Sequence, residues 1–242
     1  MKNETALITV PRMATHGQMK EINTLMLQAV PELTFEVATA IIGNKGEFLT
    51  KAADLFPNPA ILADPVKQWE DFYDKTLDMV VDLSQVKIPP RRQGFNRLII
   101  IAKGLSMNRV YDACAKHFNC WRYNDDLYAS VTKNDRTSAE SYAIWVKDTV
   151  EADENLKNLS ADSLKEKKIK GVTLLERMLH ELKYFRETRK HLDISNVTLC
   201  SGSRDSDGRV PDVCWNVSEF KVDWYDTGLA DPYLRAREAV TL

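Results

Sequence analysis

The chain has 242 residues, of which 44% are hydrophobic and 28% are charged, a composition typical of a folded protein with its own core. Its formal net charge at pH 7 is −2, so no overall charge attracts it to nucleic acid or to an anionic membrane. The longest apolar run, Leu98 to Ala102, is far shorter than the roughly 20 residues of a membrane-spanning helix, and the N-terminus lacks the apolar core of a secretory signal. We therefore expect a cytoplasmic protein with no membrane partner.

The first part of the chain, residues 1–60, is predicted to form a helical region of its own. Its first helix is marked by apolar residues at the spacing i, i+3, i+4 and i+7, namely Ile22, Leu25, Met26 and Ala29. Two more short helices are predicted before the proline-rich segment at residues 57–59. Three short helices also occur in helix-turn-helix proteins, but the third one offers only Lys45 and Lys51 as cations. We therefore expect a small helical appendage.

The main domain, residues 61–242, is predicted to begin with a helix near Pro65. Asp64 and Pro65 suit the N-cap and the first helical position, because proline lacks the N–H that would be unpaired there. This helix should bury one aromatic and apolar face, made of Trp69, Phe72, Tyr73, Leu77 and Val80.

A strand, a helix and a second strand are predicted next. The run Arg97–Gly104 is apolar and β-branched, which indicates a strand that is covered on both faces. Ser106 suits the N-cap of the helix that follows, and residues 120–123 suit a short strand. We therefore expect Arg97–Tyr123 to form one β-α-β unit.

The middle of the domain is more polar. The segment from Asn124 to Glu140 is predicted to be a loop, and Ser141–Asp148 is predicted to be a strand, because its apolar residues alternate. Ser160 is predicted to cap a short surface helix within a charge-rich segment.

The clearest helix pattern covers Thr173 to about Lys190. Thr173 and Glu176 suit a capping box, in which each side chain pairs with a backbone N–H at the helix start. The predicted buried stripe contains Leu175, Met178, Leu179, Leu182 and Phe185. Three closing strands follow, and the last two form a hairpin around Ser218 and Glu219. The patterns together predict an α+β fold: a mixed sheet containing one β-α-β unit and a C-terminal hairpin, with an N-terminal helical appendage.

The four cysteines form no recognisable metal or disulfide pattern. Cys114 and Cys120 are separated by five residues and Cys200 and Cys214 by thirteen, whereas zinc sites favour shorter spacings. Cys114 also lies on an apolar helical stripe. We therefore expect structural thiols, no bound metal and no cofactor.

Familiar nucleotide and hydrolase motifs are absent from the sequence. The dinucleotide fingerprint needs three closely spaced glycines and the P-loop ends in Gly-Lys-Ser/Thr, and neither pattern follows the isoleucine run. No Gly-x-Ser-x-Gly occurs either. The segment Asp205–Gly208 resembles the start of an EF-hand loop, but Cys214 stands where that loop needs glutamate.

One short pattern resembles a metal-dependent nuclease site. Pro211-Asp212 and Glu219-x-Lys221 supply two carboxylates that could hold Mg²⁺ and a lysine that could activate water. The spacing is short for such a motif, however, and Glu219 falls in the predicted hairpin turn. In that hairpin, Asp212 and Lys221 are expected to form an ordinary cross-strand ion pair.

The most distinctive segment is the polar stretch Ser201–Pro211, which lies between two predicted strands. Arg204 and Arg209 could bind an anion together with Ser203, because guanidinium groups suit phosphate and carboxylate. Asp205 and Asp207 would then orient the arginines or bind a cation. The alternative is an ordered turn with local Arg–Asp pairs and no ligand.

A second polar cluster follows the predicted β-α-β unit. It contains Arg122 and Asp126, and Lys103 follows the apolar strand. Ligand sites of α/β proteins gather beyond the carboxyl ends of strands, so these side chains would line a basic crevice if they lie near Arg204. Aromatic residues on the predicted strands could stack on bases, but we favour cross-strand packing for them.

From about Ile61 onward the chain resembles a widespread family of uncharacterised proteins from the genomes of uncultured bacteria. The resemblance rests on the phrases GFNRLIIIAKGLS, YAIWVKDTVEADENLKNLSAD, TLLERMLHELKYFRETRKHLDI and TLCSGSRDSDGRVPDVCW. It implies a bacterial origin and no assigned activity, and it carries over no catalytic residue.

The leading functional hypothesis is a non-enzymatic binding protein for nucleic acid or another anionic partner. The predicted ligand-binding residues are Lys103, Arg122, Asp126, Ser203, Arg204, Asp205, Asp207 and Arg209. Two alternatives stay open, a metal-dependent phosphodiesterase or nuclease and a protein-interaction module. The first would use Asp205, Asp207, Asp212 and Glu219.

Overall fold

The computed structural model describes residues 17–18, 20–21, 24, 39, 43 and 64–242. The chain divides into two units, Met1–Asp64 and Pro65–Leu242. Of the eight described residues of the first unit, all but Asp64 are helical. The apolar faces and ends predicted for its three helices lie outside the described residues.

The second unit has helices and strands interspersed as far as the helix Leu174–Thr188, and five consecutive strands follow. Its elements are α5 (Pro65–Leu77), β1 (Arg97–Ile101), α6 (Met107–Ala115), β2 (Cys120–Arg122), α7 (Leu127–Ser130), β3 (Val131–Asn134), β4 (Tyr142–Val146), η1 (Glu154–Leu156), α8 (Ala161–Glu166), α9 (Leu174–Thr188), β5 (Val197–Leu199), β6 (Ser203–Asp205), β7 (Val210–Asn216), β8 (Glu219–Tyr225) and β9 (Leu234–Ala236).

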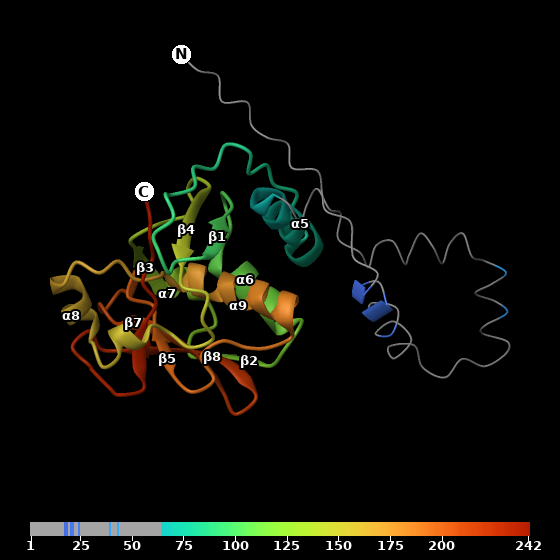
Figure 1. Ribbon diagram of the computed structural model, residues 1–242. Coiled ribbons are helices and arrows are strands. Elements are labelled where there is room, and N and C mark those ends of the chain that lie inside the picture. The colour runs from blue at the N-terminus through green and yellow to red at the C-terminus, as the bar shows by residue number, and fades with distance from the viewer. Residues whose placement is uncertain (1–16, 19, 22–23, 25–38, 40–42, 44–63) are drawn as a thin grey trace, which may run out of the picture. The chain divides into compact units, whose positions relative to one another are not determined.

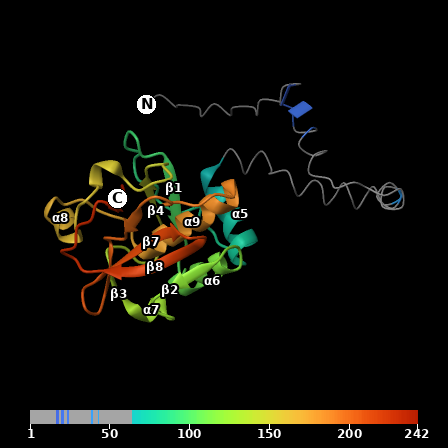
Figure 2. The same cartoon turned by 90° about the horizontal axis from the view of Figure 1, so that it is seen from below.

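The second unit has an α+β fold in which helices lie between two sheets. The antiparallel pair β1–β4, with α5 beside it, lies on one side of α6 and α9, and a five-stranded sheet lies on the other side (Figure 1). Figure 2 shows β7 and β8 of that sheet in front of α9. The strand order is β2-β8-β7-β5-β9, with β2 parallel to β8 and β9 parallel to β5. The remaining contacts are antiparallel, so the predicted mixed sheet is confirmed.

Helix α9 is the central element of this arrangement. Its predicted capping box is present, since Thr173 Oγ1 accepts from Glu176 N and a Glu176 carboxylate oxygen accepts from Thr173 N. All residues from Leu174 to Leu182 are buried, including the charged ones. The predicted apolar stripe is therefore correct but incomplete, because sheets cover the helix on opposite sides.

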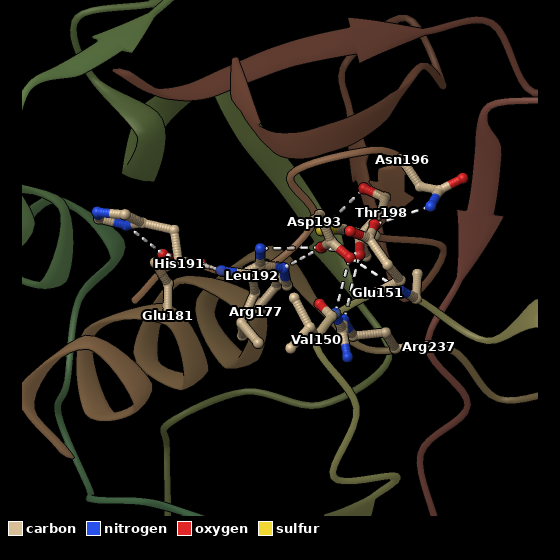
Figure 3. A network of polar contacts seen from close by, with 12 residues as sticks. Val150, Glu151, Arg177, Glu181, His191, Leu192, Asp193, Asn196, Thr198 and Arg237 are labelled. Carbon is tan, nitrogen blue, oxygen red and sulfur yellow. Dashed lines mark hydrogen bonds and ion pairs between the residues drawn. The ribbon is translucent and has the colours of Figure 1, made fainter. Parts of the chain in front are cut away.

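Two charged residues of α9, Arg177 and Glu181, belong to a buried polar network (Figure 3). Arg177 donates to Glu181 and to Asp193 at 2.9 Å each. Arg237 donates to the same Asp193 carboxylate at 2.7 Å, and Thr198 Oγ1 donates to it as well. The network ties the helix to the segment after it, to β5 and to the end of the chain.

Tyr73 of α5 covers the open edge of β1. Its hydroxyl donates to Ile100 O and accepts from Ala102 N, both at 2.9 Å. One side chain therefore forms the hydrogen bonds that these backbone groups would otherwise make with a neighbouring strand. Burial raises the pKa of this phenol above its ordinary value.

Three local predictions need correction. A strand, a helix and a second strand follow one another over Arg97–Tyr123, as predicted. They do not form a β-α-β unit within one sheet, however, because β1 pairs with β4 and β2 pairs with β8 in the five-stranded sheet. The segment Asn124–Glu140 contains α7 and β3 as well as loops. Helix α5 ends at Leu77, which leaves Val80 94% exposed.

The C-terminal hairpin is confirmed, with one change in its register. Strands β7 and β8 are joined by Val217 and Ser218, both of which have positive φ, as a tight hairpin turn requires. Glu219 is therefore the first residue of β8, opposite Asn216, and not a turn residue. Of the helices in the described part of the chain, none is long and apolar enough to cross a membrane.

Candidate anion-binding site

Two glycines bring the distinctive Ser201–Pro211 segment against the start of α9. Gly202 N donates to Val172 O at 3.0 Å, and Asp135 N donates to Gly202 O at 2.8 Å. A Cβ on Gly171 would lie 1.9 Å from Ser201 Oγ, and one on Gly202 would lie 2.9 Å from Gly171 O. Only residues without a side chain permit this close approach.

The approach creates a cavity of about 440 Å³, which we call the Arg204 cavity. Strands β3 and β6 pair beside it, with Lys133 opposite Arg204. Five cationic side chains line the cavity, against one carboxylate, that of Asp135. The cations are Lys133, Lys165, Lys168, Lys170 and Arg204.

These five cations have no carboxylate partner among the residues that the structure describes. Arg204 donates through Nη1 to the carbonyl oxygens of Ser201 and Ser203, each at 2.7 Å. Lys170 Nζ donates to the Thr241 hydroxyl at 3.1 Å. The cavity therefore gathers positive charge that nothing within residues 64–242 neutralises by an ion pair.

Arg204 is the most enclosed of the five cations. Burial lowers the pKa of its guanidinium, against the attraction of Asp135 and Asp162. A charge that is partly removed from water and unpaired gains free energy from an opposite charge placed beside it. Its backbone acceptors fix its orientation, so an incoming anion meets a guanidinium already in place.

The wall that carries Asp135 is held rigidly against α9. The neighbouring Arg136 forms a bidentate pair with Glu176, through Nε at 2.6 Å and Nη2 at 2.8 Å. Its Nη2 also donates to Gly171 O at 2.7 Å. Tyr142 Oη donates to the same carboxylate at 3.0 Å. One buried glutamate therefore caps the helix and holds both Arg136 and Tyr142 against it.

A second cavity, of about 550 Å³, adjoins the first, and we call it the Tyr142 cavity. Asp135 and Lys170 line both cavities and form the wall between them. The remaining lining side chains mix cations, carboxylates and hydroxyls, and they include Lys87, Thr137, Glu140 and Tyr142.

Among the predicted site residues, Arg204 is the one that the structure places on the lining of either cavity. Ser203 lies directly behind it and is buried, with its Oγ accepting from Leu174 N at 2.9 Å and donating to Asn134 Oδ1 at 2.6 Å. Ser203 therefore holds β6 against β3 and the start of α9.

The predicted residues of the β6–β7 turn hold one another. Asp205 is buried and accepts from the backbone N–H groups of Asp207 and Arg209 at 3.0 and 2.8 Å. It also accepts from Arg209 Nε at 2.8 Å. The Asp207 carboxylate is exposed and lies 3.7 Å from Arg209. These contacts give the ordered turn with a local Arg–Asp pair that the sequence left open as an alternative.

The remaining predicted residues lie apart from the Arg204 cavity. Lys103 forms an exposed ion pair with Glu140 at 2.8 Å. Arg122 lies over the ring of Tyr111, 4.3 Å from its centroid. Asp126 is the N-cap of α7. The structure thus does not bring Lys103, Arg122 and Arg204 into a shared cavity.

The four lysines of the site were missed by the sequence analysis. Three of them, Lys165, Lys168 and Lys170, lie in the run LKEKKIK, and that charge run was the available signal. Such runs usually mark a solvated surface, so the pattern alone does not predict a site. Lys133 lies in β3, within a segment predicted to be a loop.

The nuclease-like pattern has a different geometry from the one expected. Asp212 lies opposite Asp223, and Lys221 pairs with Asp223 at 3.0 Å, so the predicted ion pair between Asp212 and Lys221 is wrong. No group of three or more histidine, cysteine and acidic side chains that could hold a metal ion occurs in the described part of the chain. All four cysteines are free thiols. Cys114 is buried in the core, as its helical stripe predicts.

Comparison of the chain with protein-family models, with curated proteins and with solved structures gives no match in any of the three. The geometry of the two cavities is therefore the basis for a functional hypothesis.

Proposed function

We propose that this protein binds an anionic partner at the Arg204 cavity, as a non-enzymatic binding protein. The observation that carries the proposal is the gathering of five cationic side chains around one carboxylate, without ion-pair partners among the described residues. Like charges held close together repel one another and destabilise the folded state. A bound anion would relieve that repulsion and would stabilise the protein.

The types of side chain favour a phosphate-bearing partner. A guanidinium presents a planar set of donors that suits phosphate or carboxylate, and lysines add charge without demanding a fixed geometry. The guanidinium of Arg204 is fixed by two backbone carbonyls, whereas Lys133, Lys165 and Lys168 reach in from neighbouring elements. This combination supports binding of a group with several negative oxygens.

We place this function in the cytoplasm. The four cysteines are free thiols, and three of them are buried. Free thiols suit a reducing compartment, because cysteines of secreted domains usually pair as disulfides.

The test is a titration of the full chain with pyrophosphate, measured by isothermal calorimetry at low and at moderate salt. We expect binding that weakens as the salt concentration rises, since screening reduces the attraction of the lysines. Replacing Arg204→Gln should weaken binding by about tenfold or more, the value of a charge-assisted hydrogen bond.

A matched pair of lysine variants gives the control. Lys165 lines the cavity, whereas Lys167 is exposed close by and does not line it. Lys165→Gln and Lys167→Gln change the net charge equally, and only the first should weaken pyrophosphate binding. Equal effects of both variants, or no binding at low salt, would contradict the proposal.

A further inference from the structure

The two adjoining cavities differ in charge, and the difference indicates what kind of ligand would span them. The Arg204 cavity has five cations against one carboxylate. The Tyr142 cavity has three cations, Lys87, Arg136 and Lys170, against the side-chain carboxylates of Asp135 and Glu140. Arg136 is already paired with Glu176, and Glu140 with Lys103. The excess of positive charge is therefore larger on the Arg204 side of the wall formed by Asp135 and Lys170, and a phosphate is favoured more strongly there than in the Tyr142 cavity.

The lining of the Tyr142 cavity suits hydroxyl groups. Carboxylates accept hydrogen bonds from neighbouring hydroxyls, and Thr137 supplies a further hydroxyl that can donate or accept. No hydrogen bond involves the side chain of Asp135 or Thr137 within residues 64–242, so both remain available. Cavities of about 440 and 550 Å³ are also in the range of small-ligand sites.

We infer that the ligand is a sugar phosphate, with its phosphate in the Arg204 cavity and its sugar hydroxyls in the Tyr142 cavity. The inference rests on the proposed function, because it uses the same cations for the phosphate. Asp135 is then a specificity residue at the boundary: it repels a bare anion and accepts hydrogen bonds from a sugar. Arg136 is a positioning residue, since it fixes the wall through Glu176 and does not face the ligand as a free charge.

The test compares inorganic phosphate with ribose 5-phosphate, glucose 6-phosphate and AMP, by calorimetry on the full chain. At least one sugar phosphate should bind about tenfold more tightly than inorganic phosphate, the gain expected from one or two added hydrogen bonds. The variant Asp135→Ala should affect the affinity for inorganic phosphate and the affinity for the sugar phosphate differently. Phosphate should bind as tightly or more tightly, because a negative charge is removed, while the sugar phosphate should lose its advantage.

A second variant and a polymer separate the remaining outcomes. Thr137→Val removes a hydroxyl of the Tyr142 cavity alone, and it should lower sugar-phosphate affinity without changing phosphate affinity. If phosphate binds and no sugar phosphate binds more tightly, the inference is wrong and the proposed function stands. If neither phosphate nor pyrophosphate binds, both are wrong. A single-stranded oligonucleotide that binds more tightly than every sugar phosphate would overturn the inference in favour of nucleic acid.

Discussion

A single pair of residues sets the close approach that forms the Arg204 cavity. Ser201 Oγ is buried and has no hydrogen-bond partner among the described residues. It occupies the space that a side chain on Gly171 would need. Because Gly171 follows Lys170 and Ser201 precedes the β6 strand of Arg204, this contact decides whether the two cations line the same cavity.

The variant Gly171→Ala should therefore destabilise the protein by about 1 to 3 kcal/mol, the usual cost of an added methyl group in a packed site. Adding Ser201→Ala should recover most of that loss, because the 1.9 Å contact is with Oγ and the nearest remaining side-chain atom is Ser201 Cβ at 3.2 Å. Ser201→Ala alone should have little effect, since it removes no hydrogen bond. Urea unfolding of the three variants measures these changes in the free energy of unfolding.

Gly228→Ala is the matched control. A Cβ there would meet nothing closer than Asp162 Oδ2 at 3.8 Å, which is an ordinary contact. That variant should leave the free energy of unfolding unchanged or raise it slightly. A loss for Gly171→Ala that Ser201→Ala does not reduce would show that the strain arises elsewhere.

At the scale of elements, the hairpin of β7 and β8 contains an unusual pair of carboxylates. Asp212 is 4% exposed, lies opposite Asp223, and has no partner for Oδ1 in the described part of the chain. Burial, together with the charge of Asp223, raises the pKa of Asp212 to about 8, against the attraction of Lys221. The folded protein therefore favours the protonated carboxyl.

This shift makes the stability depend on pH. A raised pKa means that the folded state holds a proton that the unfolded state has already lost above pH 4, so stability falls between about pH 4 and pH 8. Asp212→Asn keeps the shape of the neutral group and has no proton to lose. Relative to the wild type, it should become more stable as the pH rises through this window, by at most about 1.4 kcal/mol per pH unit.

Denaturant unfolding at pH 4, 6 and 8 measures the difference between the two proteins. Asp223→Asn serves as a second variant, because removing that negative charge should weaken the pH dependence without abolishing it. A difference between wild type and Asp212→Asn that stays constant from pH 4 to 8 would contradict the assignment.

The sequence predicts those elements whose signals are local. The capping box of α9 and the N-caps at Ser106 and Ser160 depend on side chains within one helical turn, and all three are found in the structure. The hairpin of β7 and β8 has its turn residues beside its strands. Strand pairing between distant segments has no such signal, which is why the sequence did not separate β1 and β2 into different sheets.

The candidate site was predictable to the same limited extent. Arg204 stands out because it lies in a polar segment between apolar runs. Its lysine neighbours come from β3, from α8 and from the segment after α8, and they meet it only because β3 pairs with β6 and Gly171 lies against Ser201. Neither the pairing nor the contact leaves a pattern in the local sequence.

At the scale of the whole molecule, one buried ionic network joins segments that are far apart in the chain. Asp193 accepts from Arg177, Arg237 and Thr198, and also from Ala152 N at 2.8 Å (Figure 3). Arg237 additionally donates to backbone carbonyls of the segment that follows β4. The helix between the two sheets is thus fixed to both by polar contacts as well as by apolar packing.

Both arginines pair with Asp193, and Arg237 has no other carboxylate partner among the described residues, which leads to the last prediction. Asp193→Asn should cost about 3 to 5 kcal/mol at pH 7, because it leaves buried guanidinium charges without full compensation. Its φ of 54° is tolerated by asparagine, so the loss reports the charge and not the backbone. Although burial alone would raise the pKa of Asp193, Arg237 and Arg177 hold it below its ordinary value. The wild-type advantage is therefore present above pH 4 and is lost as the pH falls through that lowered pKa.

Asp71→Asn, which breaks the exposed ion pair with Lys75, should cost less than about 1 kcal/mol when both variants are unfolded in urea. Equal losses for the two variants would mean that the buried network does not hold the layers together.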